Sequence, residues 1–332
     1  MNAQSRSSSP PAVPVAESWS LGVTLVRALL RCVPPRLAWR LGGGIGDLIG
    51  SLPLRDVHRC REHLRIAYPQ ADAAWIVRTT RRAFGHITRT SLWTAATLHW
   101  DLRRHARGIV VEGAANLREL AAACRHGQGT VGFTGHFGNW ELMSRIGSLF
   151  SALTVVGRRL RSPLIDGVVQ SARVASGAHL VYQDAPFGDF IRELRAGRLL
   201  ATLVDQDIPR LAGCFVPWFG RLAYTPSGPA AIAQLTRSPV IPVFLFWRHG
   251  RWVLHAGPRR RFPRTRDSEA DARAIIGWIT SYQEMLVRRS PEQWVWWHKR
   301  WRTRPGDQAD RSTAQEGQDN RSNRRRGDAE VG

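Results

Sequence analysis

The feature that most constrains the fold is a regular alternation of short apolar runs and helical stretches from about residue 108 onward. Helical periodicity occupies about 115–126, 139–149, 163–177, 186–196 and 226–236. The apolar runs between and beside them are typical of buried strands, and they are GIVVEG, TVGFTG, LTVVG, LLATLVD, PVIPVFLFW and RWVLHAG. This alternation predicts an α/β fold in which a mostly parallel central sheet is flanked by helices.

Further segments surround this body. Residues 19–105 carry apolar side chains at three- and four-residue steps, which predicts a helical N-terminal layer. We therefore expect one domain over 18–302, with a helical part to residue 105 and an α/β catalytic part from residue 106. Residues 1–17 and 303–332 are polar and lack periodicity, so we expect disordered tails. The run GGGIGD at 42–47 lacks both dinucleotide-loop spacing and a preceding strand, and it is expected to be a turn.

The segment 19–41 raises the question of a membrane. Its apolar run is shorter than the roughly 20 residues that a spanning helix needs, and Arg27 and Arg31 interrupt it. It is expected either to lie in a bilayer interface or to form an ordinary buried helix. Trp19, Trp39 and the arginines favour the membrane-facing alternative, because such side chains are typical of interfacial belts.

The charge of the chain predicts an anionic partner. The net charge is +22, and Lys299 is the single lysine. From Arg302 to Gly332 seven arginines face six acidic residues, so the excess positive charge lies in the folded body. Nucleic acid, an acidic protein and an anionic membrane surface all fit such a balance. The four cysteines have no paired spacing, which favours neither a zinc site nor a disulfide scaffold and indicates a reducing compartment.

A histidine at the end of an apolar run is the strongest candidate for chemistry. In VGFTGHFGNWELMSRIG, His136 follows a predicted strand, and sites gather at the carboxyl ends of parallel strands. Gly135 and Gly138 permit a sharp turn there, and Asn139 is a credible helix N-cap. Glu141 would then accept a hydrogen bond from one ring nitrogen, which leaves the other free to take a proton from a hydroxyl.

Spacing alone leaves alternatives open. A histidine near an acid is more often a structural hydrogen bond than a catalytic pair. Metal ligation is disfavoured, because no second histidine falls at ligand spacing. The motif holds no Ser or Cys nucleophile, so direct attack by a substrate hydroxyl fits better than an acyl-enzyme.

HFGNWE is very similar to the histidine–four–glutamate motif of the bacterial lipid A biosynthesis lauroyl/myristoyl acyltransferases, in the lysophospholipid acyltransferase superfamily. GRRLRSPLIDGVVQSAR resembles the second block of that family in Arg158, Pro163, Asp166 and Arg173, with Ser162 where Asn is usual. LVDQD and the following GCFVPWFGRLAYTPSGPAAIA resemble the third block, with Asp205, Phe219, Gly220, Thr225 and Pro226. REHLRIAYP, with His63 where Asn is usual, PVIPVF and PEQWVWWHKRW resemble further blocks, and the coverage is roughly 20–305.

The resemblance implies transfer of a fatty acyl chain from an acyl-carrier-protein thioester, or from acyl-CoA in some relatives, to a glycolipid hydroxyl at the cytoplasmic face of the inner membrane. No cofactor is implied, and the protein would be monotopic or peripheral. His136 would be the general base and Glu141 its orienting partner. Asp205 is a second candidate, because in some relatives the acid of the third block approaches the histidine, so the choice of carboxylate stays open.

The expected substrate-binding residues follow from the same blocks. Arg158 and Arg173 could bind phosphate groups or stabilise thioester charge, whereas Arg159 and Arg161 fit a solvated helix face better. Asn139, Trp140 and Phe219 complete the set. Phe137, Trp140, Trp218 and Phe219 would form an apolar lining that holds an acyl chain and discourages water. The expected partners are acyl-carrier protein and an anionic membrane lipid or glycolipid, and nucleic acid is not among them.

Several other interpretations stay open. The same fold could acylate a lyso-phospholipid, an ornithine lipid or another glycolipid, although Glu141 rather than Asp leans away from glycerol-3-phosphate as the acceptor. A non-enzymatic nucleic-acid binder would fit the charge, but no recognition motif is visible. The tryptophans of PEQWVWWHKRW could anchor the protein in an interface, line the acceptor pocket or pack into the core. VDQD could be a metal pair, but a structural or histidine-supporting role fits better.

Overall fold

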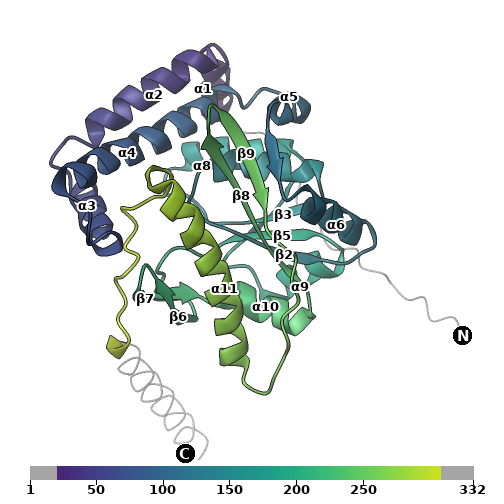
Figure 1. Ribbon diagram of the computed structural model, residues 1–332. Helices are drawn as coiled ribbons and strands as arrows, with labels where there is room; N and C mark the ends of the chain where they lie inside the picture. Colours follow the sequence, from purple (N-terminus) through teal and green to yellow (C-terminus); the bar gives the residue numbers. More distant parts are fainter. Residues whose placement is uncertain (1–20, 308–332) are drawn as a thin grey trace, which may run out of the picture.

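The computed structural model describes residues 21–307, and its body is a seven-stranded sheet of order β1-β9-β8-β2-β5-β3-β4 (Figure 1). The strands are β1 (Val110–Glu112), β2 (Thr130–Thr134), β3 (Leu153–Gly157), β4 (His179–Tyr182), β5 (Leu199–Leu203), β8 (Val240–Arg248) and β9 (Arg251–Ala256). Every neighbouring pair is parallel except the β8–β9 hairpin, so β1 and β9 run against the other five strands. The prediction of a mostly parallel α/β sheet is confirmed.

Helices cover both faces of the sheet. They are α6 (Ala114–Arg125), α7 (Trp140–Ile146), α8 (Pro163–Ala175), α9 (Phe187–Arg195), α10 (Gly228–Thr236) and α11 (Ser268–Arg289). Because successive side chains of a strand point to opposite faces, Val131 and Phe133 of β2 pack with Ile232 of α10 and Ile276 of α11. A separate apolar cluster on the sheet unites α6, α7, β8 and β9. Figure 1 shows α11 crossing in front of the sheet.

The N-terminal residues form the predicted helical layer. Its helices are α1 (Leu21–Arg31), α2 (Pro35–Ile49), α3 (Arg55–Ala67), α4 (Ala73–Ala96) and α5 (Leu102–Ala106). The long helices α2 and α4 pack side by side beyond the β8–β9 hairpin (Figure 1). Within residues 21–307, no helix combines the length and the apolar character needed to cross a bilayer.

The glycine run was predicted wrongly as a turn, because Gly42 to Asp47 lie inside α2. A side chain at Gly46 would put its Cβ 2.3 Å from the carbonyl oxygen of Phe84, and one at Gly42 would come within 2.5 Å of Arg89 Cα. Glycine therefore lets the backbones of α2 and α4 approach, and tertiary packing outweighs its low helix propensity.

Other elements went unpredicted. They are β4, the antiparallel hairpin of β6 (Gly213–Trp218) and β7 (Arg221–Pro226), α11, and the short 3₁₀ turns η1 (Gly147–Leu149) and η2 (Pro291–Gln293). The predicted C-terminal tail begins too early, because Thr303 is buried and bonds to Asp207 through its backbone N–H and its hydroxyl. Residues 1–20 and 308–332, which hold the rest of both predicted tails and Trp19, lie outside the described residues.

The tryptophan-rich segment belongs to the core rather than to an exposed anchor. The side chains of Trp294 and Trp296 are 0% exposed. Trp297 stacks on Phe84 with ring centroids 4.2 Å apart, and Trp301 meets His63 edge-on at 5.1 Å. The segment thus joins the helical layer to the carboxyl edge of the sheet.

Candidate active site

The strand register brings His136 and Asp205 together. β2 and β5 are parallel neighbours in which Thr134 lies opposite Leu203. His136 and Asp205 each follow two residues after these paired strand ends. Equal offsets beyond adjacent parallel strands place both side chains at one point of the carboxyl edge, where α/β folds bind their ligands.

Asp205 holds the imidazole through two contacts. Its Oδ1 lies 2.8 Å from His136 Nδ1, and its Oδ2 accepts the backbone N–H of His136 at 2.7 Å. Oδ2 also accepts Trp294 Nε1–H at 2.8 Å and Gln283 Nε2–H at 3.0 Å. Burial raises the pKa of Asp205, but the charge and hydrogen bonds of His136 outweigh it and hold that pKa well below its usual range. Asp205 is thus a fixed carboxylate that accepts a hydrogen bond from Nδ1–H of His136.

The turn that carries His136 requires its glycines. A Cβ on Gly135 would lie 2.0 Å from Gln283 Nε2 and 2.8 Å from Asp205 Oδ2, so a side chain there would displace the carboxylate's partners. Gly138 has φ +65°, and a Cβ there would meet the carbonyl oxygen of Leu245 at 2.1 Å. The prediction that both glycines shape this turn is confirmed.

Asn139 caps α7 as predicted but does not reach the cavity. Its Oδ1 accepts the N–H of Leu142 at 2.9 Å, and its Nδ2 donates to Thr94 Oγ1 at 2.8 Å. The side chain is buried with both ends engaged. The structure therefore contradicts the expectation that Asn139 binds substrate.

Glu141 pairs with Arg173 and not with His136. Arg173 Nη2 donates to Glu141 Oε1 at 2.7 Å and Nε donates to Oε2 at 3.2 Å, in a bidentate pair. The expectation that Glu141 orients the ring is wrong for this structure, in which Asp205 occupies that position. The pair instead joins the first turn of α7, which carries Glu141, to the last turn of α8, which carries Arg173, and so fixes the guanidinium.

His136 opens on a large cavity of about 740 Å³. The structure brings four of the predicted site residues together in its lining, namely Trp140, Glu141, Arg158 and Arg173. Arg159 and Arg161 also line its exposed rim, and Arg159 lies 4.0 Å from the centre of the Tyr182 ring. The site therefore combines one imidazole with a basic, partly apolar hollow.

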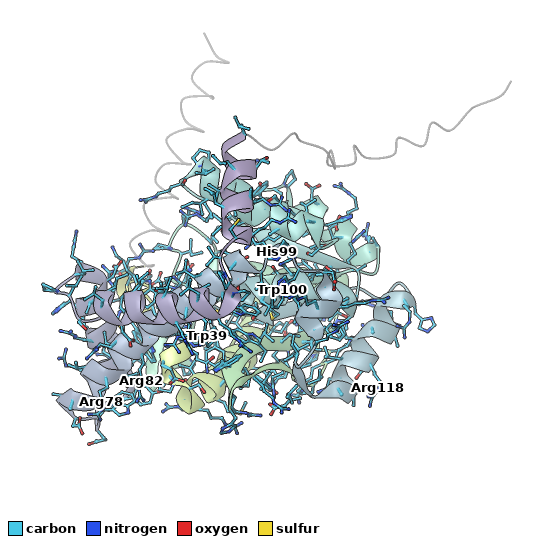
Figure 2. The ribbon with its side chains drawn as sticks, turned by 90° about the horizontal axis from the view of Figure 1, so that it is seen from above. Trp39, Arg78, Arg82, His99, Trp100 and Arg118 are labelled. Atoms are coloured by element: carbon cyan, nitrogen blue, oxygen red, sulfur yellow. The ribbon has the colours of Figure 1, made fainter. Side chains whose placement is uncertain are left out.

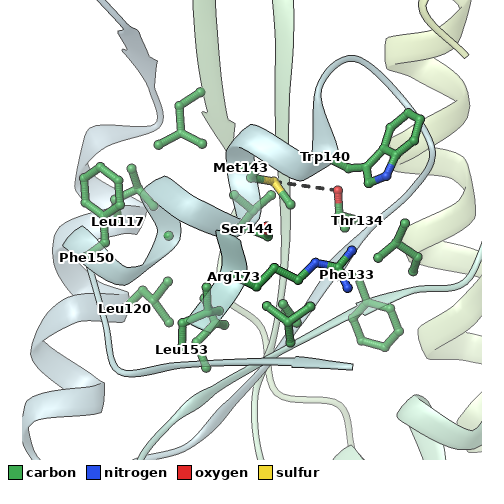
Figure 3. A pocket seen from close by; sticks show the side chains of 18 residues that line it. Leu117, Leu120, Phe133, Thr134, Trp140, Met143, Ser144, Phe150, Leu153 and Arg173 are labelled. Carbon is green, nitrogen blue, oxygen red and sulfur yellow. Dashed lines mark hydrogen bonds between the residues drawn. The ribbon is translucent and has the colours of Figure 1, made fainter. Parts of the chain in front are cut away.

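A second pocket adjoins this cavity and is almost wholly apolar. Trp140, Arg173 and Leu203 line both spaces. Figure 3 shows Leu117, Leu120, Phe150 and Leu153 around the apolar pocket and the Arg173 side chain reaching toward Thr134 and Phe133. The junction of a polar cavity and an apolar pocket thus lies beside the imidazole.

Three aromatic residues predicted to line the site lie elsewhere. Phe137, Trp218 and Phe219 belong to the core cluster between the sheet and the helical layer. Phe219 is 5% exposed, has φ +50°, and stacks with Arg288. The substrate-binding expectation for Phe219 is contradicted, because the hairpin β6–β7 turns it toward α11 and away from the cavity.

Gln206 and His298 are site residues that sequence reasoning missed. Gln206 Nε2 lies 3.1 Å from His136 Nε2 and 3.1 Å from His298 Nε2. The amide donates to both rings, so the proton of His136 belongs on Nδ1 and its lone pair on Nε2. Burial and the neighbouring His136 lower the pKa of His298 to about 3. The available signals were the position of Gln206 beside Asp205 and the polar HKR triplet inside an aromatic run.

The contacts of the two aspartates in VDQD favour a structural or histidine-supporting role over a metal pair. Asp205 is occupied by His136, Trp294 and Gln283, while Asp207 accepts two bonds from Thr303. Across residues 21–307, no group of three or more His, Cys, Asp or Glu side chains is arranged to hold a metal ion.

Comparisons with known proteins identify the family of this chain. The family described as bacterial lipid A biosynthesis acyltransferase matches residues 10–303. The lipid A biosynthesis lauroyltransferase of Escherichia coli is 26% identical over 278 residues, which cover 82% of this chain and 88% of that protein. The lipid A biosynthesis acyltransferase of Haemophilus influenzae is 29% identical over 284 residues, with 83% and 85% covered. The phosphatidylinositol mannoside acyltransferase of Mycolicibacterium smegmatis is 22% identical over 191 residues, with 56% and 61% covered.

These matches decide between an enzyme and a non-enzymatic binder. A non-enzymatic nucleic-acid binder is set aside, because the match covers both the helical layer and the α/β body. The resemblance seen in the separate sequence blocks is confirmed over most of the chain. The chain belongs to the bacterial lipid A biosynthesis acyltransferase family and is an acyltransferase.

Proposed function

We propose that this protein moves a fatty acyl chain from an acyl-carrier-protein thioester to a hydroxyl of a lipid A-type glycolipid, with His136 as the general base. The observation that carries the proposal is an imidazole held by a buried carboxylate at the wall of a cavity of about 740 Å³. Its Nε2 is the nitrogen left to accept a proton. No cofactor is needed, because the thioester supplies the activated acyl group.

The proposed reaction balances around His136. The acceptor hydroxyl replaces the Gln206 amide as the donor to Nε2 and gives its proton to the ring as its oxygen attacks the thioester carbonyl. The carbon–oxygen ester bond forms, the tetrahedral intermediate collapses, and the carbon–sulfur bond breaks. The imidazolium then returns the proton to the leaving thiolate. Asp205 stabilises the imidazolium in between, as a carboxylate does in a hydrolase triad.

Arg173 is the best placed cation for the charge that develops on the carbonyl oxygen. It lines both the large cavity and the apolar pocket, so a thioester whose carbonyl lies where the two spaces meet would lie next to Arg173. The bidentate contact with Glu141 holds the guanidinium in place before the reaction. A preorganised donor of this kind stabilises an oxyanion more than mobile water does.

The helical layer is the proposed membrane contact. Leu21, Leu25 and Leu29 recur every four residues on α1 and are 86%, 58% and 60% exposed. Leu37, Leu41, Ile45 and Leu48 continue the exposed apolar stripe on α2, and arginines flank it. Figure 2 shows this layer from above, with Trp39 labelled near α2 and Arg78 and Arg82 at one end. An amphipathic, arginine-bearing surface suits an anionic leaflet.

The cavity lies next to this surface. α1 contacts α8, the exposed Leu164 and Ile165 lie in the first turn of α8, and the exposed Leu160 lies just before it. Leu160 also lines the large cavity. A lipid acceptor could therefore reach the rim of the cavity along apolar side chains, while the basic body attracts an acidic carrier protein.

The direct test is acyl transfer by the purified chain. Lauroyl- or myristoyl-carrier protein is incubated with a lipid A precursor in mixed micelles, and the lipids are measured by mass spectrometry. The proposal predicts an acceptor heavier by one acyl chain. If the donor is only hydrolysed, and no tested acceptor becomes acylated, the assignment of this site as a transferase fails.

A second acceptor class has one specific observation in its favour. The mycobacterial relative is a phosphatidylinositol mannoside acyltransferase by its description, so a related chain acylates a different glycolipid. The same assay with lyso-phospholipid, ornithine lipid or mannosylated lipid, and with acyl-CoA in place of the carrier protein, separates the alternatives. The proposal predicts the highest kcat/KM with the lipid A precursor and the carrier-protein donor.

A further inference from the structure

A second hollow, of about 410 Å³, opens beside the catalytic cavity and is strongly basic. Its charged lining contains four cations, Arg158, Arg210, Lys299 and Arg302, and one acid, Asp207. Two short segments supply all but Arg158, because Asp207 and Arg210 follow β5 and Lys299 and Arg302 follow the buried tryptophans. The segment after β5, which carries Asp205, and the segment after the buried tryptophans, which carries His298, therefore also bring these cations together.

The one acid of this hollow, Asp207, lies 3.9 Å from Arg302 Nη2 and neutralises only one of the four cations. Asp207 is buried and accepts two bonds from Thr303, and Arg302 Nη2 donates to its backbone oxygen at 2.8 Å. Arg158, Arg210 and Lys299 are exposed and form no ion pair with any of residues 21–307. Asp207 thus leaves three cations of the hollow without an ion pair, and these repel one another unless an anion lies between them.

This basic hollow shares three lining residues with the catalytic cavity, which are Arg158, Gln206 and Ile208. Gln206 lines both it and the catalytic cavity, and Arg158 lies on the shared rim. His298 forms part of its wall, and its ring contacts that of His136 edge-on at 4.7 Å. An anion bound here would therefore lie next to the group that reacts at His136 Nε2, within the span of a single substrate.

We propose that Arg158, Arg210, Lys299 and Arg302 form a subsite for a phosphate group carried by one of the two substrates. Arginine binds phosphate through two parallel hydrogen bonds and lysine through a mobile point charge, so the set suits a tetrahedral oxyanion better than a planar carboxylate. This inference rests on the proposed acyl transfer. Two substrates carry such a group, namely a phosphorylated glycolipid acceptor and the phosphopantetheine arm of the donor.

The kinetic test uses Arg210→Gln combined with Lys299→Met, with Arg264→Gln as the control, because Arg264 is exposed and lies outside the hollow. Arg302 is left in place because it contacts Asp207. Each lost charge-assisted bond should cost roughly tenfold in affinity. We expect the double variant to raise KM about 100-fold for the phosphate-bearing substrate while kcat changes less than threefold. A rise confined to the acceptor or to the donor identifies the source.

A substrate that lacks the phosphate shows whether the loss in the double variant comes from the phosphate contact. Dephosphorylated acceptor, or acyl-pantetheine in place of acyl-phosphopantetheine, should show the same loss with the unmodified protein and little further loss with the double variant. Unchanged KM values for both substrates in the double variant, beside an active parent protein, would overturn the subsite.

Direct binding separates this inference from the proposed function. Inorganic pyrophosphate is titrated into the full chain by calorimetry at low salt, where electrostatic contacts are least screened. We expect binding that the double variant weakens at least tenfold and that Arg264→Gln leaves unchanged. Binding of this kind without any acyl transfer would support the subsite and reject the transferase proposal, whereas equal binding by all variants would reject the subsite.

Discussion

At the scale of single residues, the site separates two carboxylates by environment. Asp205 is buried and bonded to the ring, to an indole and to an amide, so it stays ionised and fixed. Glu141 is about one-third exposed and contacts a guanidinium. The first arrangement controls the tautomer of His136, and the second controls the position of Arg173.

Glu141 and Arg173 should therefore act as one unit. We expect Glu141→Gln and Arg173→Met each to lower kcat about 10–100-fold, since a displaced oxyanion donor costs that much or more. The double variant should be no worse than Arg173→Met alone, because the glutamate acts through the arginine. Single-turnover transfer rates for the four proteins test this, and fully additive losses would show that Glu141 has a role apart from Arg173.

The turn before α7 was predictable because its signals are local. Gly135, Gly138 and Asn139 announce a sharp turn and a cap within a few residues. For Asp205, family resemblance and the VDQD run suggested a histidine-supporting role, but neither could choose between Asp205 and Glu141, because that choice depends on which strands are neighbours. The pattern of strands along the sequence does not show that β2 and β5 are neighbours. The contact between His136 and Asp205, each two residues beyond paired strand ends, could therefore not be predicted from it. Gln206 and His298 were missed for the same reason.

At the scale of elements, the glycines of α2 allow the backbones of α2 and α4 to approach closely. Gly46→Ala forces a Cβ against the Phe84 carbonyl, and we expect a loss of about 1–3 kcal/mol in the free energy of unfolding. Gly44 is the matched control, because no atom lies within 4 Å of a Cβ built there. Gly44→Ala should stabilise the helix by roughly 0.5–1 kcal/mol. Equal effects of the two substitutions in urea unfolding would contradict the close α2–α4 contact.

At the scale of the whole molecule, we expect the free energy of unfolding to fall with falling pH before the carboxylates are protonated. Burial, with help from the Arg89 charge, lowers the pKa of His86 to about 3, and burial and Arg145 lower that of His105 to about 4. Unfolded histidine binds a proton near pH 6.5, whereas these native side chains do not, so protons favour the unfolded state. The stabilisation by Asp205, whose pKa is lowered, is lost only below about pH 4.

The expected result is a free energy of unfolding that falls between about pH 6.5 and pH 4.5, by up to about 1.4 kcal/mol per pH unit for each such histidine. Urea midpoints at pH 7.5, 6.0 and 5.0 measure it. His86→Gln should flatten the slope, even though it lowers stability at pH 7.5. A stability that stays level across this range would show that these histidines are not held neutral.

The proposed membrane contact is also tested at the scale of the whole molecule. Replacing Leu25 and Leu29 of α1 by Glu should abolish flotation with vesicles that contain anionic lipid, because each buried leucine contributes about 1.5–3 kcal/mol. Leu235→Glu is the control, since Leu235 is 50% exposed on α10, away from the helical layer. Transfer to a micellar, short-chain acceptor should persist in all variants. Unimpaired flotation of the Leu25/Leu29 variant would place the membrane contact elsewhere.

The central claim is that His136, held by Asp205, removes the proton of the acceptor hydroxyl. Single-turnover transfer from acyl-carrier protein to the lipid acceptor tests it in His136→Ala, Asp205→Asn and the exposed-histidine control His126→Ala. We predict no measurable transfer for the first, a loss of roughly 10³–10⁴-fold for the second, and the parent rate for the third. Transfer at the parent rate by folded His136→Ala protein would contradict the account.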